Sequence, residues 1–184
     1  MLYFDIETDG LQENVTKGHC LVIIDEQNNI SAYRPNDFKK GAMRLIAALR
    51  DGESICGRNI INYDCAVLAK LYPEFRIKRE WRPQVLDTLV LARLICGNVE
   101  DTDHARVRNG TLPAKLLGRQ SLKAWGYRLG ELKGITINLQ TFILIAIFIF
   151  RQVVELMLQH PRHLLSAAGV EVLISLNRYT CFIP

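Results

Sequence analysis

What this sequence lacks excludes several protein classes. Its five cysteines are odd in number and include no C-x-x-C pair, so we expect reduced thiols rather than a zinc site or a disulfide framework. It has no long basic run and a net charge of only +4, which permits nucleic-acid binding without arguing for it. An acid follows the first four residues directly, so we predict no signal peptide and expect a cytoplasmic protein.

Composition and residue pattern indicate one globular α/β domain. Hydrophobic residues make up 49% of the 184 residues and charged residues 23%, which is typical of a folded protein. The predicted strands come early, and helices at apolar spacing follow them, as in an α/β layered domain. We expect strands at 2–4, 19–24, 30–34 and 54–56, helices at 38–49, 64–71, 88–95 and 122–129, and a long loop at 98–116. Asp87 is expected to cap the helix at 88–95, and Ser121 and Gly130 are expected to cap and end the helix at 122–129.

Two acids follow the first predicted strand. In a strand, residues i and i+2 point to the same side, so Asp5 and Glu7 would face one spot. Paired hard oxygen ligands suit Mg²⁺ or Mn²⁺. The alternative is an exposed strand end with two solvated acids.

A second polar cluster occupies residues 57–64, after a predicted strand and at the start of a predicted helix. Asp64 would open that helix, where it could add a third carboxylate to the first two. The alternative is that Asn62 or Asp64 serves as an ordinary helix cap.

Taken together, the two clusters resemble the DEDD exonuclease superfamily. The shared pattern is Asp-x-Glu at 5–7 followed by Asn-x-x-x-Tyr-Asp at 59–64. Further blocks at 87–95, 101–103 and 121–134 resemble the 3′→5′ exonuclease domain of family A DNA polymerases from T-seven-like podophages. The resemblance covers about residues 1–134.

This resemblance implies a ribonuclease H-like mixed sheet flanked by helices, here truncated, and a proofreading nuclease. Such enzymes hydrolyse phosphodiester bonds with two divalent ions, Mg²⁺ or Mn²⁺, held by four acids. The partner would be the 3′ end of single-stranded DNA, in the cytoplasm of a phage-infected bacterium. The implied catalytic and metal-binding residues are Asp5, Glu7 and Asp64, and the implied DNA-binding residues are Leu11, Asn59, Asn62 and Tyr63. A packing role for Leu11 is an equal alternative.

The family's fourth carboxylate has no counterpart in this sequence. It lies on a late helix in a Tyr-x-x-x-Asp or His-x-x-x-Asp pattern, whereas no Asp follows Asp103 here. Tyr127 precedes Glu131 by four residues, but this pair belongs to a different block. We therefore expect an incomplete two-ion site and severely weakened hydrolysis, and whether the chain is an active enzyme stays open. The alternative function is a catalytically weak remnant that binds single-stranded DNA.

Residues 135–184 form an atypical hydrophobic tail to which we assign no domain. Sixteen residues without a charge, 135–150, precede a segment that Pro161 interrupts. The tail is expected to be apolar and helical, and we favour a reading frame that leaves a polymerase gene near Gly134. A real C-terminal extension is one alternative. A membrane span is disfavoured because the run is shorter than the roughly 20 residues needed. We expect no polymerase domain within these 184 residues.

Overall fold

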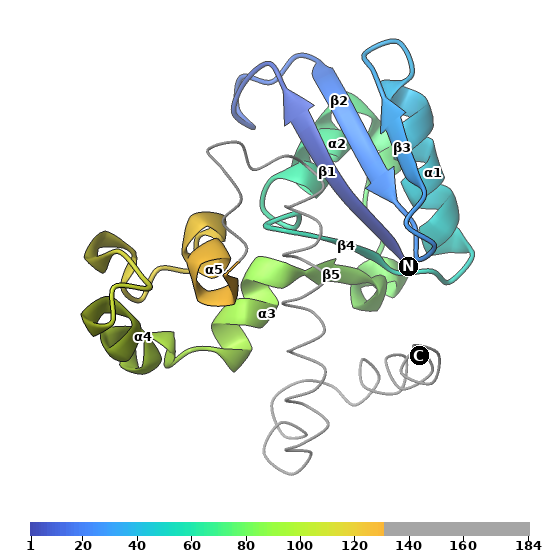
Figure 1. The fold of residues 1–184 in the computed structure, drawn as a ribbon. Helices are drawn as coiled ribbons and strands as arrows, with labels where there is room; N and C mark the ends of the chain where they lie inside the picture. Colours follow the sequence, from blue (N-terminus) through green and yellow to red (C-terminus); the bar gives the residue numbers. More distant parts are fainter. Residues whose placement is uncertain (131–184) are drawn as a thin grey trace.

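The structure, a computed structural model, describes residues 1–130 (Figure 1). The predictions for the tail at 135–184, its helical character included, lie outside the described residues. None of the helices within 1–130 has the length and apolar character that crossing a bilayer requires.

A five-stranded mixed sheet forms the centre of the fold, in the order β3-β2-β1-β4-β5. Strand β2 is antiparallel to both of its neighbours, β1 and β3, whereas β4 is parallel to β1 and β5 is parallel to β4. This α/β arrangement is consistent with the expected ribonuclease H-like fold. The strands are β1 (Leu2–Thr8), β2 (Gly18–Ile24), β3 (Ile30–Tyr33), β4 (Ile55–Gly57) and β5 (Val85–Asp87).

Helices flank this sheet in two groups. The first two helices pack on the main core, and the last three gather beyond the β4–β5 edge, away from β3 (Figure 1). The helices are α1 (Phe38–Arg50), α2 (Asp64–Leu71), α3 (Thr88–Ile95), α4 (Val99–Arg108) and α5 (Leu122–Leu129), with short 3-10 turns at Pro73–Phe75, Arg79–Gln84 and Ala114–Leu116.

The main core explains why β1 alternates in burial. Leu2, Phe4 and Ile6 are buried in one cluster with side chains of α1 and α2. Because successive strand residues point to opposite faces, Asp5 and Glu7 lie on the other face of the sheet. The strand pattern therefore gives β1 one apolar face and one face that carries the acids.

Two of the sequence predictions were wrong in detail. Residues 98–116 were expected to form a loop, but α4 occupies ten of them. Only Val99 and Asp103 of this helix are buried, so it has no apolar period to detect. Strand β1 was expected to end at residue 4, but it pairs with β2 as far as Thr8. Asp5 and Glu7 therefore lie within the strand rather than after it.

The Asp103 carboxylate attaches this polar helix to α5. Its side chain is fully buried and accepts from Arg128 Nε at 3.0 Å and from Arg128 Nη2 at 2.6 Å. The guanidinium also lies 4.9 Å from the Trp125 ring. A buried ion pair with these additional contacts holds α4 in place of an apolar face.

Strand β4 ends where it closely approaches β1. A Cβ added to Gly57 would lie 2.7 Å from the Phe4 carbonyl oxygen and 2.5 Å from Ile60 Cγ2. The first of these is a backbone atom within the sheet, so it cannot move aside cheaply. Gly57 thus permits the chain to turn directly beside the acid-bearing half of β1.

We predict that Gly57→Ala destabilises the protein by about 2–3 kcal/mol, because the methyl group forces β4 away from β1. Urea denaturation of the full chain measures this loss. Gly10→Ala is the matched control, because its nearest contact would be an ordinary 3.5 Å. Equal stabilities for the two variants would contradict the prediction.

Candidate functional site

The acid-bearing face of β1 carries Asp5 and Glu7 side by side in register with β2. Asp5 lies opposite Val22, and Glu7 lies opposite Cys20. The Asp5 side chain is half-buried, whereas Glu7 is exposed. One carboxylate is therefore partly withdrawn from solvent, and the other remains open to it.

Asp64 reaches this pair from the start of α2. Its side chain is 3% exposed, and its Oδ1 accepts from the Ile6 N–H at 3.3 Å. Strand β4 pairs with β1 only at Leu2 and Tyr3, so the Ile6 amide has no partner from β4. The structure thus places Asp64 against the residue that lies between Asp5 and Glu7 in the chain.

Burial and mutual repulsion alter the acidity of this cluster. Burial, followed by the charge of Glu7, raises the pKa of Asp5 to about 6. Burial, followed by the charge of Asp5, raises the pKa of Asp64 to about 7. The donated Ile6 amide only partly offsets these effects. A cluster of buried like charges with raised pKa values is typical of functional sites.

A complete metal centre is not assembled among the described residues. Within 1–130, no three His, Cys, Asp or Glu side chains lie together so that they could hold one ion. The donor chemistry of Asp5, Glu7 and Asp64 suits Mg²⁺ or Mn²⁺, because all three offer hard oxygen ligands. Their role as metal ligands stays a prediction.

Asp87 organises the turn that leads to Asp64, a role that the sequence did not reveal. Its side chain is 3% exposed. It accepts from the Asn59 N–H at 2.8 Å and the Ile61 N–H at 3.1 Å. The predicted cap of α3 is confirmed, since Leu89 N–H and Val90 N–H also donate to Asp87, at 2.9 and 3.4 Å. The helix-cap pattern in the sequence predicted only the contacts with Leu89 and Val90.

The four residues predicted to bind DNA lie on the loop after β1 and on the turn before α2. Leu11 is 76% exposed in the loop after β1. Asn59 has a left-handed backbone with φ of 58° and accepts from Asn62 Nδ2 at 3.4 Å. The Tyr63 hydroxyl donates to the Gly10 carbonyl at 2.8 Å. Tyr63 therefore already has a hydrogen-bond partner within the protein. DNA contact by each of the four residues stays a prediction.

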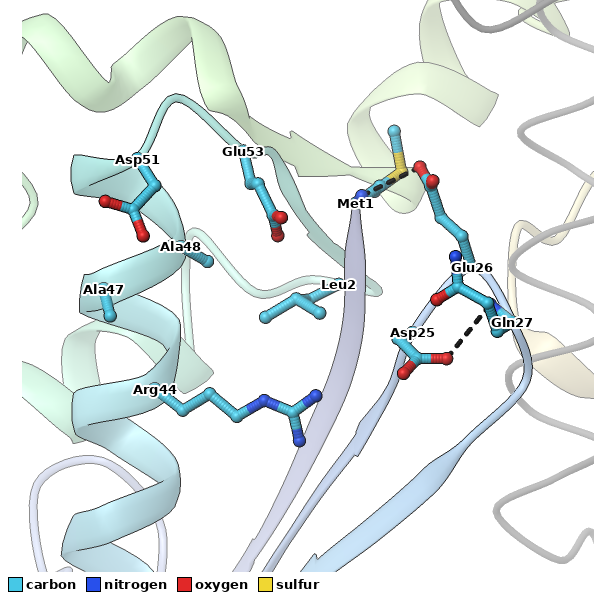
Figure 2. A pocket seen from close by; sticks show the side chains of 10 residues that line it. All are labelled: Met1, Leu2, Asp25, Glu26, Gln27, Arg44, Ala47, Ala48, Asp51 and Glu53. Carbon is cyan, nitrogen blue, oxygen red and sulfur yellow. Dashed lines mark hydrogen bonds and ion pairs between the residues drawn. The ribbon is translucent and has the colours of Figure 1, made fainter.

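A cavity of about 350 Å³ lies at the opposite end of β1, beside Met1 and Leu2 (Figure 2). Its wall includes the Met1 ammonium, which donates to Glu26 Oε1 at 2.8 Å, and Asp25, which accepts from the Gln27 N–H at 3.0 Å. None of the predicted site residues lines it. The cavity is therefore separate from the acid cluster.

Sequence comparison relates this chain to phage DNA polymerases. It is 45% identical to the DNA-directed DNA polymerase of Enterobacteria phage T3 and 44% identical to that of Escherichia phage T7, each over 138 residues. These alignments cover 73% of this chain and 20% of each relative, so the chain spans about a fifth of the length of the curated relatives it matches. No protein-family model matches the chain.

We predict that Asp64→Asn stabilises the protein at pH 8 but not near pH 4. Above pH 7, wild-type Asp64 is charged in both states, and burial makes that charge costly only in the folded one. As the pH falls through 7, the folded state binds a proton before the unfolded state does, so this group increasingly favours folding. The neutral variant should be more stable by about 1–3 kcal/mol at pH 8.

Chemical denaturation at pH 8, 6 and 4 measures this difference. Asp51→Asn, an exposed acid after α1, controls for the loss of one charge. A stability difference for Asp64→Asn that does not vary with pH would rule out the proposed burial penalty.

Proposed function

We propose that this chain carries an impaired form of a 3′→5′ DNA exonuclease domain, of the type that proofreads for a phage DNA polymerase. The observation that carries the proposal is the hydrogen bond from Ile6 N–H to Asp64 Oδ1, because Ile6 lies between the two strand acids in the chain. The relatives are named DNA-directed DNA polymerases, which supports DNA as the substrate. Such an activity would act in the cytoplasm of the infected bacterium.

The acids would serve as ligands for divalent ions at the 3′ end of a single strand. A bound Mg²⁺ or Mn²⁺ would lower the pKa of a water molecule and stabilise the departing oxygen. Asp5 and Glu7 would hold it from the acid-bearing face of β1, and Asp64 would hold it from α2. Asp64, whose pKa is raised to about 7, holds a proton part of the time at neutral pH, and Asp5, whose pKa is raised to about 6, does so about one pH unit lower, so a cation must displace these protons. Metal binding should therefore strengthen between pH 6 and pH 8.

DNA would be held by the groups around these carboxylates. Asn59 and Asn62 offer side-chain amides on the turn between β4 and α2. Leu11 offers an exposed apolar contact on the loop that follows β1. Amide donors can hold a strand end, while an apolar side chain can lie against a base. These groups would place the terminal phosphodiester near the acids.

Impairment follows from the number of carboxylates. With no Asp after Asp103, a site built from Asp5, Glu7 and Asp64 lacks one anionic ligand. Losing an anionic ligand lowers the affinity of the site for the ion and leaves the ion less firmly positioned. Hydrolysis should be severely slowed, while contacts to the strand remain.

A second candidate function is DNA binding without turnover. The absence of a three-ligand group within residues 1–130 favours it. In this form the chain would keep the surface around β1 and α2 that contacts the strand, and it would hold a metal ion only weakly. The two candidates differ in cleavage, not in binding.

We predict that the full chain trims 3′-labelled single-stranded DNA at least about 100-fold more slowly than an intact polymerase exonuclease, because an anionic ligand is missing. Any residual cleavage should require Mg²⁺ or Mn²⁺ and be lost in Asp5→Asn. Glu53→Gln, at the far cavity, is the matched control and should leave it unchanged. A gel-based time course with and without EDTA measures both effects.

Binding of the same oligonucleotide in EDTA separates the two candidates. Binding that falls steeply as salt rises, without cleavage in metal, identifies the second candidate. Turnover comparable to that of the intact enzyme would refute the impairment. No binding at any salt concentration would refute both candidates.

A further inference from the structure

The loop between β1 and β2 is held rigidly although most of it is exposed. Asp9 Oδ1 accepts from the Thr16 N–H at 3.0 Å and from the Lys17 N–H at 3.1 Å, which closes the base of the loop. Val15 is 3% exposed and belongs to the main core. The loop is therefore fixed at its base and by one buried side chain.

Leu11 lies at the exposed part of this loop. Its carbonyl accepts from Asn14 N–H at 2.8 Å and from Val15 N–H at 2.9 Å, so its backbone is fixed. Its side chain is nevertheless 76% exposed. Because its backbone is already fixed, this residue would lose little freedom on contact with a partner outside the chain.

Tyr63 connects this loop to the helix that carries Asp64. Its hydroxyl lies 2.8 Å from the Gly10 carbonyl and 2.6 Å from Thr8 Oγ1, which in turn lies 2.9 Å from the same carbonyl. Two hydroxyl protons serve these three contacts, so two are hydrogen bonds at any moment. Gly10 directly precedes Leu11, so Tyr63 acts on the backbone next to the exposed side chain.

Lys70 makes a second connection from the same face of α2. Its ammonium donates to the Gln12 carbonyl at 3.0 Å and to the Glu13 carbonyl at 2.7 Å. Lys70 follows Tyr63 by seven residues, which is two helical turns and returns to the same side of the helix. The two side chains thus hold the backbone on both sides of Leu11.

We propose that Tyr63 and Lys70 are positioning residues that hold Leu11 in a fixed place beside the acid cluster. There the Leu11 side chain lies against the terminal base of a single-stranded 3′ end. This inference rests on the proposed function. It assigns Tyr63 to the protein's own loop rather than to DNA. It also gives Lys70, a residue that the sequence did not single out, a part in binding.

The physical basis is that helix α2 serves two tasks. Its first residue, Asp64, lies against β1, and the same helix fixes the loop that bears Leu11. The distance between the base contact and the carboxylates is then set by one rigid element. Loosening the loop should weaken base contact without moving the acids.

A double-mutant cycle tests this coupling in EDTA, with a short oligonucleotide that carries 2-aminopurine at its 3′ end. We expect Leu11→Ala to weaken binding by the full chain about fivefold and to reduce the fluorescence change. Tyr63→Phe combined with Lys70→Met should have a similar effect. In the Leu11→Ala background this pair should cause no further loss, because the contact it positions is already absent.

The matched control is Tyr33→Phe with Lys40→Met, which makes the same chemical changes on β3 and α1. Binding should stay within about twofold of wild type. If the Tyr63–Lys70 double variant does not fold, Tyr63→Phe alone decides, because it removes only a hydroxyl.

If the Tyr63 and Lys70 substitutions weaken oligonucleotide binding further in the Leu11→Ala background, the inference is overturned and the proposed function stands. An affinity equal to that of wild type, both for Tyr63→Phe with Lys70→Met and for Tyr63→Phe alone, would also overturn the inference and leave the proposed function standing. No oligonucleotide binding by the wild-type chain would overturn the inference together with the proposed function.

Discussion

The geometry of the site depends on the buried carboxylate of Asp87. It accepts two N–H groups from the start of α3 and two from the turn at Asn59 and Ile61. Without this acceptor, those part-buried N–H groups would lose their partner, and the turn would lose its attachment to the end of β5. Because the turn leads directly into α2, the same contacts determine where Asp64 meets β1.

The carboxylates withdrawn from solvent in this fold lie in two different environments. Asp87 and Asp103 are each surrounded by donors, backbone N–H groups for the first and the Arg128 guanidinium for the second. Although burial opposes it, the hydrogen bond from Arg128 keeps the pKa of Asp103 below its ordinary value. Within residues 1–130, no ion pair joins Asp5 or Asp64 to a cation, and burial with repulsion raises their pKa values. Uncompensated charge therefore separates the candidate site from the structural acids.

The elements that the sequence predicted well are those with a local signal. Helix α1 has an apolar stripe, and α5 has a Ser121 cap and a left-handed Gly130 at its end, as expected. Helix α4 was missed because a buried ion pair, not an apolar face, holds it in place. Strand β5 was also missed.

The sequence by itself determined that Asp5 and Glu7 share a face, that Asp87 caps a helix, and that the chain resembles a phage exonuclease domain. The strand period and the helix caps each involve residues only two to four positions apart, so they can be recognised in the sequence alone. Only the tertiary structure decided that Asp64 meets the Ile6 amide, that Asp87 also holds a turn 26 to 28 residues away, and that Tyr63 bonds to Gly10. Each of these contacts joins residues distant in the chain, and only the packing of α2 and β5 against β1 and β4 brings them within hydrogen-bonding distance.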